Sequence, residues 1–243
     1  AQIAKKMFAD KFKLAVSGRY DKSSNFDGRF TPRISGVLTV APDNNIRVSY
    51  QTGYRNPTTQ NQYIDLSVAG GRQRLIGGIP SMLNKYNMLT TDIPFTDVSY
   101  RAFLGSVAAG APNPALLKQY NFDPRGVRPE SVQAYEVGYK GLLGPRFLID
   151  AYAYYNTYKN FITAVDVFQQ NDDNSFSKFG VPVNATGKVT SYGGALGLDY
   201  LIGGYNLSGN VSYNKLGDLP ADYINDFNTP EIRYNLGLGN KEI

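Results

Sequence analysis

The side chains that most often perform acid–base or metal chemistry are missing from this sequence. Its 243 residues contain no histidine and no cysteine. A Ser-His-Asp triad, a cysteine nucleophile and a zinc-thiolate site are therefore excluded within this chain. No enzyme activity, no cofactor and no metal site are predicted.

Charged residues nevertheless fall at regular positions of patterned segments. They could form a paired acid/base site, or a salt-bridge network that lines or braces a wall. The network is the favoured interpretation, because no hydrolytic constellation accompanies these residues. The charged residues concerned are Arg47, Glu136, Asp150, Asp199 and Arg233.

Two other patterns could bind ions. Asp166, Asp172 and Asp173 could offer oxygen ligands to calcium, although a solvated polar loop explains them better. Four glycine pairs could cradle phosphate, but none has the required spacing between a strand and a helix, so turns are favoured. The net charge is +5 with scattered Lys and Arg, and no nucleic-acid surface is predicted. The glycine pairs begin at Gly70, Gly77, Gly193 and Gly203.

The most suggestive ligand-binding stretch is residues 55–63, which is dense in Asn, Gln and Thr and ends on a tyrosine. Such a stretch suits a polar or sugar-like ligand. A loop that packs on its neighbours is the alternative, and the sequence does not separate the two. The candidate ligand-binding residues are Arg55, Asn56, Gln60, Asn61, Gln62 and Tyr63.

The elements that carry these residues alternate polar and apolar positions. In residues 206–214, Leu207, Val211 and Tyr213 share one parity, and Asn and Ser fill the other. A period of two predicts a strand with chemically opposite faces. Eight such strands are predicted, at residues 12–20, 32–40, 46–54, 132–140, 146–158, 190–200, 206–214 and 232–238. Their connections alternate between long and short throughout.

This layout is typical of a transmembrane β-barrel, with tight turns at one rim and long loops at the other. A Lys or Arg on the lipid face at mid-depth costs roughly 2–4 kcal/mol, and the apolar parities of these eight strands avoid charge. No run of eighteen apolar residues predicts a membrane helix. Tyrosines near strand ends predict an interfacial girdle, with generic strand preference as the alternative; they are Tyr20, Tyr54, Tyr139, Tyr155, Tyr158 and Tyr200.

Two intervals lack the alternation. Residues 55–130 are predicted to form a very long exterior loop with short helices at residues 100–109 and 115–120, the second capped by Asn113 and Pro114. Residues 160–188 are predicted to form a second long polar loop. No signal peptide opens the chain, and the last five residues look like a turn, so we expect a chain cut at both ends.

Several strings resemble the barrel of TonB-dependent outer-membrane receptors of the Bacteroidetes type. They are Phe30-Thr-Pro-Arg-Ile-Ser35, Val48-Ser-Tyr-Gln-Thr-Gly-Tyr-Arg-Asn-Pro-Thr58 and Asn228-Thr-Pro-Glu-Ile-Arg-Tyr-Asn-Leu236. The most specific is the stretch from Arg128 to Gly141, which contains Pro129-Glu130 and Tyr135-Glu136-Val137-Gly138-Tyr139-Lys140. The resemblance covers nearly the whole chain.

This resemblance implies an all-β antiparallel fold in which residues 1–243 form about eight strands of a 22-stranded barrel. The plug domain and the C-terminal strands would be absent from the chain. It implies a protein of the Gram-negative outer membrane, surrounded by lipid, that imports an oligosaccharide, peptide, siderophore or cobalamin. Energy would come from TonB, ExbB and ExbD through the missing plug, and a surface lipoprotein lid is a further implied partner.

Two alternatives stay open on the sequence. The first is a complete eight-stranded outer-membrane barrel that serves as an anchor or adhesin, since eight is an allowed even strand number. The second is a soluble β-sandwich that binds a ligand, for which a core-sized surplus of apolar residues is lacking.

Overall fold

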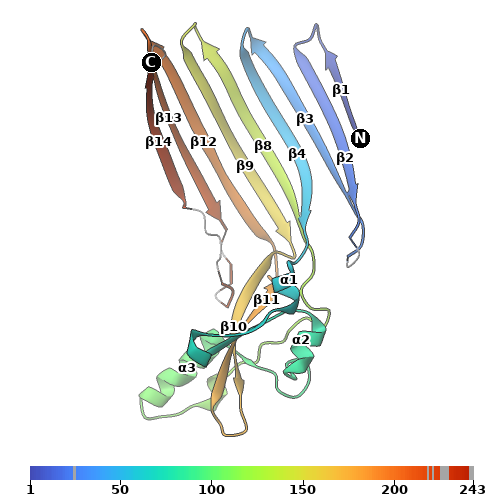
Figure 1. The fold of residues 1–243 in the computed structure, drawn as a ribbon, viewed down its shortest axis with the longest axis vertical. Helices are drawn as coiled ribbons and strands as arrows, with labels where there is room; N and C mark the ends of the chain where they lie inside the picture. Colours follow the sequence, from blue (N-terminus) through green and yellow to red (C-terminus); the bar gives the residue numbers. More distant parts are fainter. Residues whose placement is uncertain (24–25, 218, 221, 225–229, 241–243) are drawn as a thin grey trace.

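A computed structural model of the chain describes residues 1–23, 26–217, 219–220, 222–224 and 230–240. It consists of one tall sheet and a smaller domain attached to one rim of that sheet (Figure 1). Parts of two predicted loops, at residues 24–25 and 225–229, lie outside the described residues, as do residues 241–243 of the predicted C-terminal turn.

The tall sheet has nine strands among the described residues, each antiparallel to its neighbours and in an order that keeps chain order. All eight predicted strands are confirmed. The missed strand is β1, which pairs with β2 from Gln2↔Ser17 to Met7↔Phe12. The strands are β1 (Gln2–Met7), β2 (Phe12–Asp21), β3 (Arg29–Ala41), β4 (Asn44–Arg55), β8 (Glu130–Leu143), β9 (Phe147–Lys159), β12 (Val189–Ile202), β13 (Tyr205–Leu216) and β14 (Ile232–Asn240).

Residues of the apolar parity pair with one another from strand to strand, so they lie on one face of the sheet. Leu207 lies opposite Leu238, and Val211 lies opposite Tyr234. Their exposed fractions are 46% for Leu207, 44% for Val211 and 69% for Leu238, so this face is not a dry protein interior. A wide exposed apolar face is what a lipid-facing barrel wall requires. We call it the outward face.

Three charged residues of the described strands share the outward parity: Lys5 in β1, Lys159 at the end of β9 and Lys215 in β13. Lys5 of β1 pairs with the apolar Leu14, two residues from the end of the strand. A long Lys side chain near a membrane boundary extends its amine to the polar zone, so its cost is small there.

The predicted tyrosine girdle is correct in parity for five of its six members. Tyr20, Tyr54, Tyr139, Tyr155 and Tyr200 fall on the outward parity by strand register. Tyr158 has the opposite parity, so its prediction is wrong. Its hydroxyl lies 3.2 Å from the Ser191 hydroxyl, and its ring packs edge-on against Phe161.

The smaller domain is built from the two intervals that were predicted to be loops. Its five-stranded sheet has the order β5-β6-β11-β10-β7. The prediction of a long polar loop at residues 160–188 is wrong, because β10 and β11 form a hairpin there. The elements are α1 (Thr59–Tyr63), β5 (Asp65–Val68), η1 (Ala69–Gly71), β6 (Gln73–Ile76), α2 (Pro80–Lys85), β7 (Phe95–Thr96), α3 (Asp97–Ala108), η2 (Pro114–Leu116), β10 (Ile162–Gln170) and β11 (Phe176–Asn184).

The two predicted helices have different outcomes. The one at residues 100–109 is confirmed as α3, which begins three residues earlier and is capped by the Thr96 side chain. The one at residues 115–120 is only the short 3-10 helix η2, although Asn113 caps it as predicted by accepting a hydrogen bond from the Ala115 amide. Among the described residues, no helix is long and apolar enough to cross a membrane.

The smaller domain, which we call the exterior domain because it contains the predicted exterior loop, has a hydrophobic core of its own. Ile76, Val165, Val167 and Val181 are completely buried, and α2 contributes Leu83. The remaining core residues are Met88, Phe122, Phe179 and Val183. Because β10 and β11 each alternate valines toward this core, the hairpin is stabilised by burial rather than by its polar turn.

Candidate ligand-binding site

The charged residues of the tall sheet form a brace on its inner face. Arg47 Nε lies 3.6 Å from Glu136 Oε1, and Arg47 Nη2 lies 3.4 Å from Asp150 Oδ1. Lys140 Nζ lies 3.4 Å from Asp150 Oδ2. Each carboxylate therefore faces a cation on another strand, which confirms the predicted salt-bridge network for three of its five members. Asp199 and Arg233 make no ion pair with any residue that the structure describes.

The predicted calcium ligands do not converge. Asp166 accepts a hydrogen bond from Gln73 and pairs with Lys178 at 2.6 Å. Asp173 accepts hydrogen bonds from Ser175. Within the described part of the chain, no group of three or more acidic side chains is placed to hold a metal ion.

Residues 55–63 connect the tall sheet to the exterior domain. Arg55, the last residue of β4, donates from Nη2 to Glu130 Oε2 at 2.9 Å and to the Ile162 carbonyl at 3.2 Å. Glu130 also accepts from the Ile162 amide at 2.8 Å. These contacts join the rim ends of β4, β8 and β10, and we call them the rim clasp.

The other candidate residues of this stretch divide into structural and exposed positions. Asn61 completes a capping box at α1 with Thr58. Gln62 is buried and donates to the Pro57 carbonyl at 2.8 Å. Gln60 and Tyr63 are exposed, and Asn56 holds its side-chain oxygen buried without a hydrogen-bond partner. Ligand binding by residues 55–63 stays a prediction, and Gln60 and Tyr63 are the members best exposed for it.

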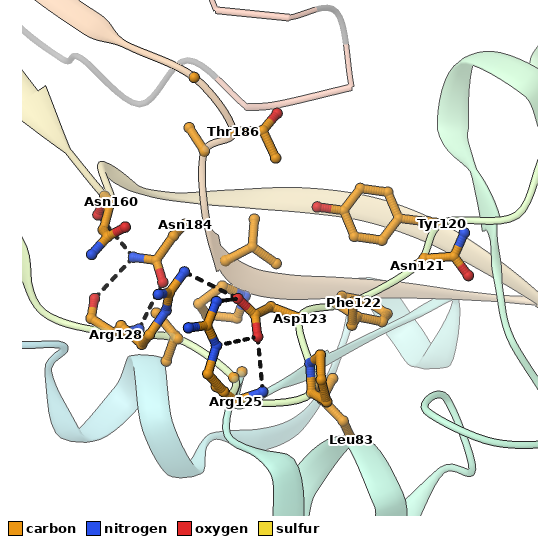
Figure 2. A pocket seen from close by; sticks show the side chains of 18 of the residues that line it. Leu83, Tyr120, Asn121, Phe122, Asp123, Arg125, Arg128, Asn160, Asn184 and Thr186 are labelled. Carbon is orange, nitrogen blue, oxygen red and sulfur yellow. Dashed lines mark hydrogen bonds and ion pairs between the residues drawn. The ribbon is translucent and has the colours of Figure 1, made fainter.

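A cavity lies where the exterior domain meets the end of β9 (Figure 2). Its volume is about 610 Å³, which falls in the range of small-molecule sites. One wall is the segment that precedes β8, and the other is formed by the end of β11 and the residues after it. The lining residues are Gly78, Leu83, Tyr120–Arg128, Lys159, Asn160 and Pro182–Gly187.

The charge of this cavity is predominantly positive. Its lining contains three cationic residues, Arg125, Arg128 and Lys159, against one carboxylate, Asp123. Asp123 pairs with Arg125 Nη2 at 2.9 Å and with Arg128 Nη2 at 3.0 Å. The hydrogen bond from Arg125 lowers the pKa of Asp123 to about 2, so the carboxylate stays ionised. Arg128 Nε is buried and has no hydrogen-bond partner, which leaves a donor at this site unused.

Asn184 holds the two walls of the cavity together. Its side-chain oxygen accepts from the Arg128 amide at 2.7 Å. Its side-chain nitrogen donates to the carbonyls of Arg128 and Asn160, at 2.9 and 2.8 Å. Gly126 allows the sharp turn beside Arg128, since its φ is 69° and a side chain there would collide with the Gly78 carbonyl. The cationic residues are thus set on a fixed backbone.

Tyr120 lines the cavity, and its hydroxyl is hydrogen-bonded to Tyr223. Burial raises the pKa of Tyr120, so its phenol keeps the proton at neutral pH. None of the cavity residues was predicted from the sequence as a site. The available signal was Asp123-Pro-Arg-Gly126, where two opposite charges flank a turn, but it lay inside a predicted loop.

The fold and the site together define a class of protein. An antiparallel sheet with an exposed apolar outward face, a charged inner face and an exterior domain at one rim is part of an outer-membrane β-barrel. Residues 5–241 match the family model "TonB dependent receptor-like, beta-barrel". The chain therefore belongs to the TonB-dependent receptor family, whose members are outer-membrane transporters of Gram-negative bacteria.

Solved structures share this fold at low sequence identity. The siderophore receptor PirA from Pseudomonas aeruginosa is 15% identical with a TM-score of 0.55, over 85% of this chain and 31% of that one. PirA from Acinetobacter baumannii is 13% identical with a TM-score of 0.54, over 93% and 28%. The Serratia marcescens hemophore receptor HasR, solved with its hemophore HasA and heme, is 11% identical with a TM-score of 0.53, over 86% and 32%.

The chain spans between about a quarter and a third of the length of these three structures. No curated protein sequence matches it.

Proposed function

We propose that the full-length protein carrying this chain is an energised importer of the outer membrane. The chain would contribute part of a 22-stranded barrel, and a plug domain and further strands would complete it. Family membership supports this proposal, as does the short span of the chain along its structural neighbours. The edge strands β1 and β14 each pair on one side only, which suits a sheet that continues into further strands.

Energy would reach the protein from TonB, ExbB and ExbD through that plug. The outward face would contact outer-membrane lipid. A surface lipoprotein lid would sit over the exterior domain, where α3 exposes Val98, Leu104 and Val107. Exposed apolar side chains on a helix are compatible with a protein partner.

The ligand class follows from the cavity beside β9. Three cations against one ionised carboxylate favour a small ligand that presents carboxylate or phosphate oxygens. Among oligosaccharides, peptides, siderophores and cobalamin, this favours acidic members over neutral sugars. The single observation that carries the proposal is this fixed basic cavity. Gln60 and Tyr63 would offer a second contact surface at the base of the exterior domain.

The test is an uptake assay in strains that lack the gene and carry it back on a plasmid. The probes are radiolabelled ferric citrate, cobalamin, an acidic pentapeptide and a neutral maltodextrin. The full-length protein carries either Arg125→Gln with Arg128→Gln, or the matched control Arg72→Gln with Arg146→Gln. Both control arginines are exposed and lie outside the cavity.

We expect uptake of an anionic probe to require TonB. Loss of the two cavity arginines should raise the probe concentration for half-maximal uptake at least about tenfold, because a hydrogen bond to a charged group contributes roughly 1.5–3 kcal/mol to binding. The control pair should keep wild-type uptake. Uptake that persists without TonB would contradict the importer, and transport of the maltodextrin alone would contradict the anionic ligand class.

A further inference from the structure

The outward face carries a continuous row of tyrosines across five strands. Tyr50 lies opposite Tyr135, which lies opposite Tyr155 on its other side, and Tyr155 lies opposite Tyr192. The ring of Tyr192 is in turn 6.3 Å from that of Tyr213 on β13. Tyrosine rings with an apolar body and a polar tip settle at the boundary between lipid tails and headgroups.

The spacing of aromatic residues along the strands supports this boundary. On β9, Phe147 lies at the short-turn rim and shares the parity of Tyr155, eight positions further along. Eight positions of antiparallel strand measure about 27 Å, and a strand tilt of about 35–45° projects this to about 19–22 Å along the membrane normal, a few Å short of the roughly 25 Å height of a barrel's apolar band. The tyrosine row therefore marks the exterior edge of the hydrocarbon layer.

Above this row, the outward face turns polar and basic. Register places Thr52, Gln133, Thr157 and Thr190 in the next positions. Three lysines lie on this face: Lys215 in the tyrosine row itself, and Lys159 and Lys188 one step beyond these next positions, two residues further in sequence. Lys215 is opposite Tyr192, Lys159 ends β9, and Lys188 directly precedes β12. A hollow of about 420 Å³ opens here, with Ser131, Gln133, Thr157, Lys159 and Lys188 in its lining.

Lys159 and Lys188 bring like charges together. Val189 pairs with Tyr158, so continued register sets Lys188 beside Lys159. Like charges that face each other across strands are destabilising unless an anion separates them. No ion pair with an acidic residue is found for any of the three lysines within the described ranges. The nearest rim carboxylate on β8, Glu130, is held by Arg55. Glu231, just before β14, lies on the other parity of the sheet, next to Asn214.

We propose that Lys159, Lys188 and Lys215 bind the phosphate-bearing headgroup of a lipid in the outer leaflet. The tyrosine row sets the depth of that headgroup, the apolar outward face below the row receives its acyl chains, and the lysines supply the complementary charge. The inference depends on the outer-membrane location and not on the imported ligand.

The experiment measures lipid binding to the full-length protein, purified in detergent, by native mass spectrometry. The probes are bisphosphorylated lipid A, its dephosphorylated form and inorganic phosphate as a competitor. One variant carries K159Q, K188Q and K215Q together. A second carries only K188Q and K215Q, which lie outside the basic cavity. The matched control carries K11Q, K13Q and K118Q, which remove the same charge elsewhere. Heat-modifiable migration verifies that each variant folds.

Each lysine near a charged lipid surface contributes roughly a fivefold gain in affinity. The triple variant should bind bisphosphorylated lipid A roughly a hundredfold more weakly than wild type, and the double variant roughly twenty-fivefold. The same lysines replaced by arginine should restore binding. The wild-type protein should bind the dephosphorylated form as weakly as the triple variant binds the phosphorylated one.

Four outcomes would overturn the proposal. They are triple-variant binding within about threefold of wild type, an equal loss in the control, equal binding of dephosphorylated lipid, and displacement by inorganic phosphate at the lipid's own concentration. The last would indicate a site for a free anion instead of a lipid. Should the triple variant not fold, the double variant and the two lipid forms still decide the question.

Discussion

A charge on the outward face at mid-depth is the most direct test of how the tall sheet sits in the membrane. Ala151 lies midway between Phe147 and Tyr155 on β9 and pairs with Leu196 on the outward face. On the neighbouring strand, Ala195 pairs with Tyr152 and has the opposite parity. The two alanines thus lie at almost the same height on opposite faces, and both can be replaced by arginine.

In lipid, an arginine at the bilayer midplane costs roughly 2–4 kcal/mol, whereas a position facing water inside the barrel solvates it. Ala151→Arg should therefore lower the free energy of unfolding by about 2–4 kcal/mol, equivalent to a change of roughly 30- to 700-fold in the folding equilibrium. Ala195→Arg should change it by about 1 kcal/mol or less.

The assay is guanidinium unfolding of the full-length protein in lipid vesicles, followed by tyrosine fluorescence and heat-modifiable migration. Both variants introduce the same side chain at an alanine, so helix or strand preference cancels between them. An equal destabilisation by both, or a larger one by Ala195→Arg, would refute the assignment of the outward face to lipid.

Three further predictions concern the exterior domain. Leu83→Ala should lower the stability of this domain by about 2–5 kcal/mol, because it opens a cavity at a core position that is 1% exposed. Leu66 is 51% exposed, so Leu66→Ala should change the stability by about 0.5 kcal/mol or less. Hydrogen exchange of β10 and β11 measures both changes. Hydrogen bonds from Arg74 and Lys85 lower the pKa of Asp65 from 3.8 to about 2. The ionised carboxylate therefore contributes its full stability above about pH 4, and this contribution is lost as the pH falls toward 2. Asp65→Asn should remove this acid-dependent part of the melting temperature. Asn184→Ala should cost roughly 1–3 kcal/mol because it leaves three backbone groups without partners, and faster exchange of the Arg128 amide would report it.

The strands of the tall sheet could be predicted because each one alternates between lipid and water. A period of two is a local property, so residues 206–214 reveal β13 without any knowledge of its neighbours. The missed strand β1 shows the limit of this signal. It has six residues and carries Lys5 on the outward parity, so the alternation is too short and too charged to read.

The exterior domain could not be predicted in the same way. Val165, Val167, Val181 and Val183 do alternate, but the polar turn between β10 and β11 dominates the composition of the interval. The partner strand β6 is parallel to β11 and about a hundred residues away in the chain. Pairing of that kind depends on tertiary contacts, which local periodicity does not contain.

The candidate site was hidden for a related reason. Its cations come from the segment before β8 and from the end of β9, and Asn184 at the end of β11 joins them. The sequence separates these parts by about thirty to sixty residues, and only the folded exterior domain brings them together. Residues 55–63 were interpreted as a ligand site because they are locally polar. Asn61 instead caps α1, and Gln62 donates to the Pro57 carbonyl in the connection before it.

Side chains fasten the exterior domain at each of its four connections to the tall sheet. The rim clasp ties the end of β4 to the starts of β8 and β10 through Arg55 and Glu130. Asn184 ties the end of β11 to the residues before β8 and after β9. We expect a domain held at every crossing to move with the rim as one body. The basic cavity therefore keeps a fixed position relative to the tyrosine row, because the strands that carry that row also carry the clasp.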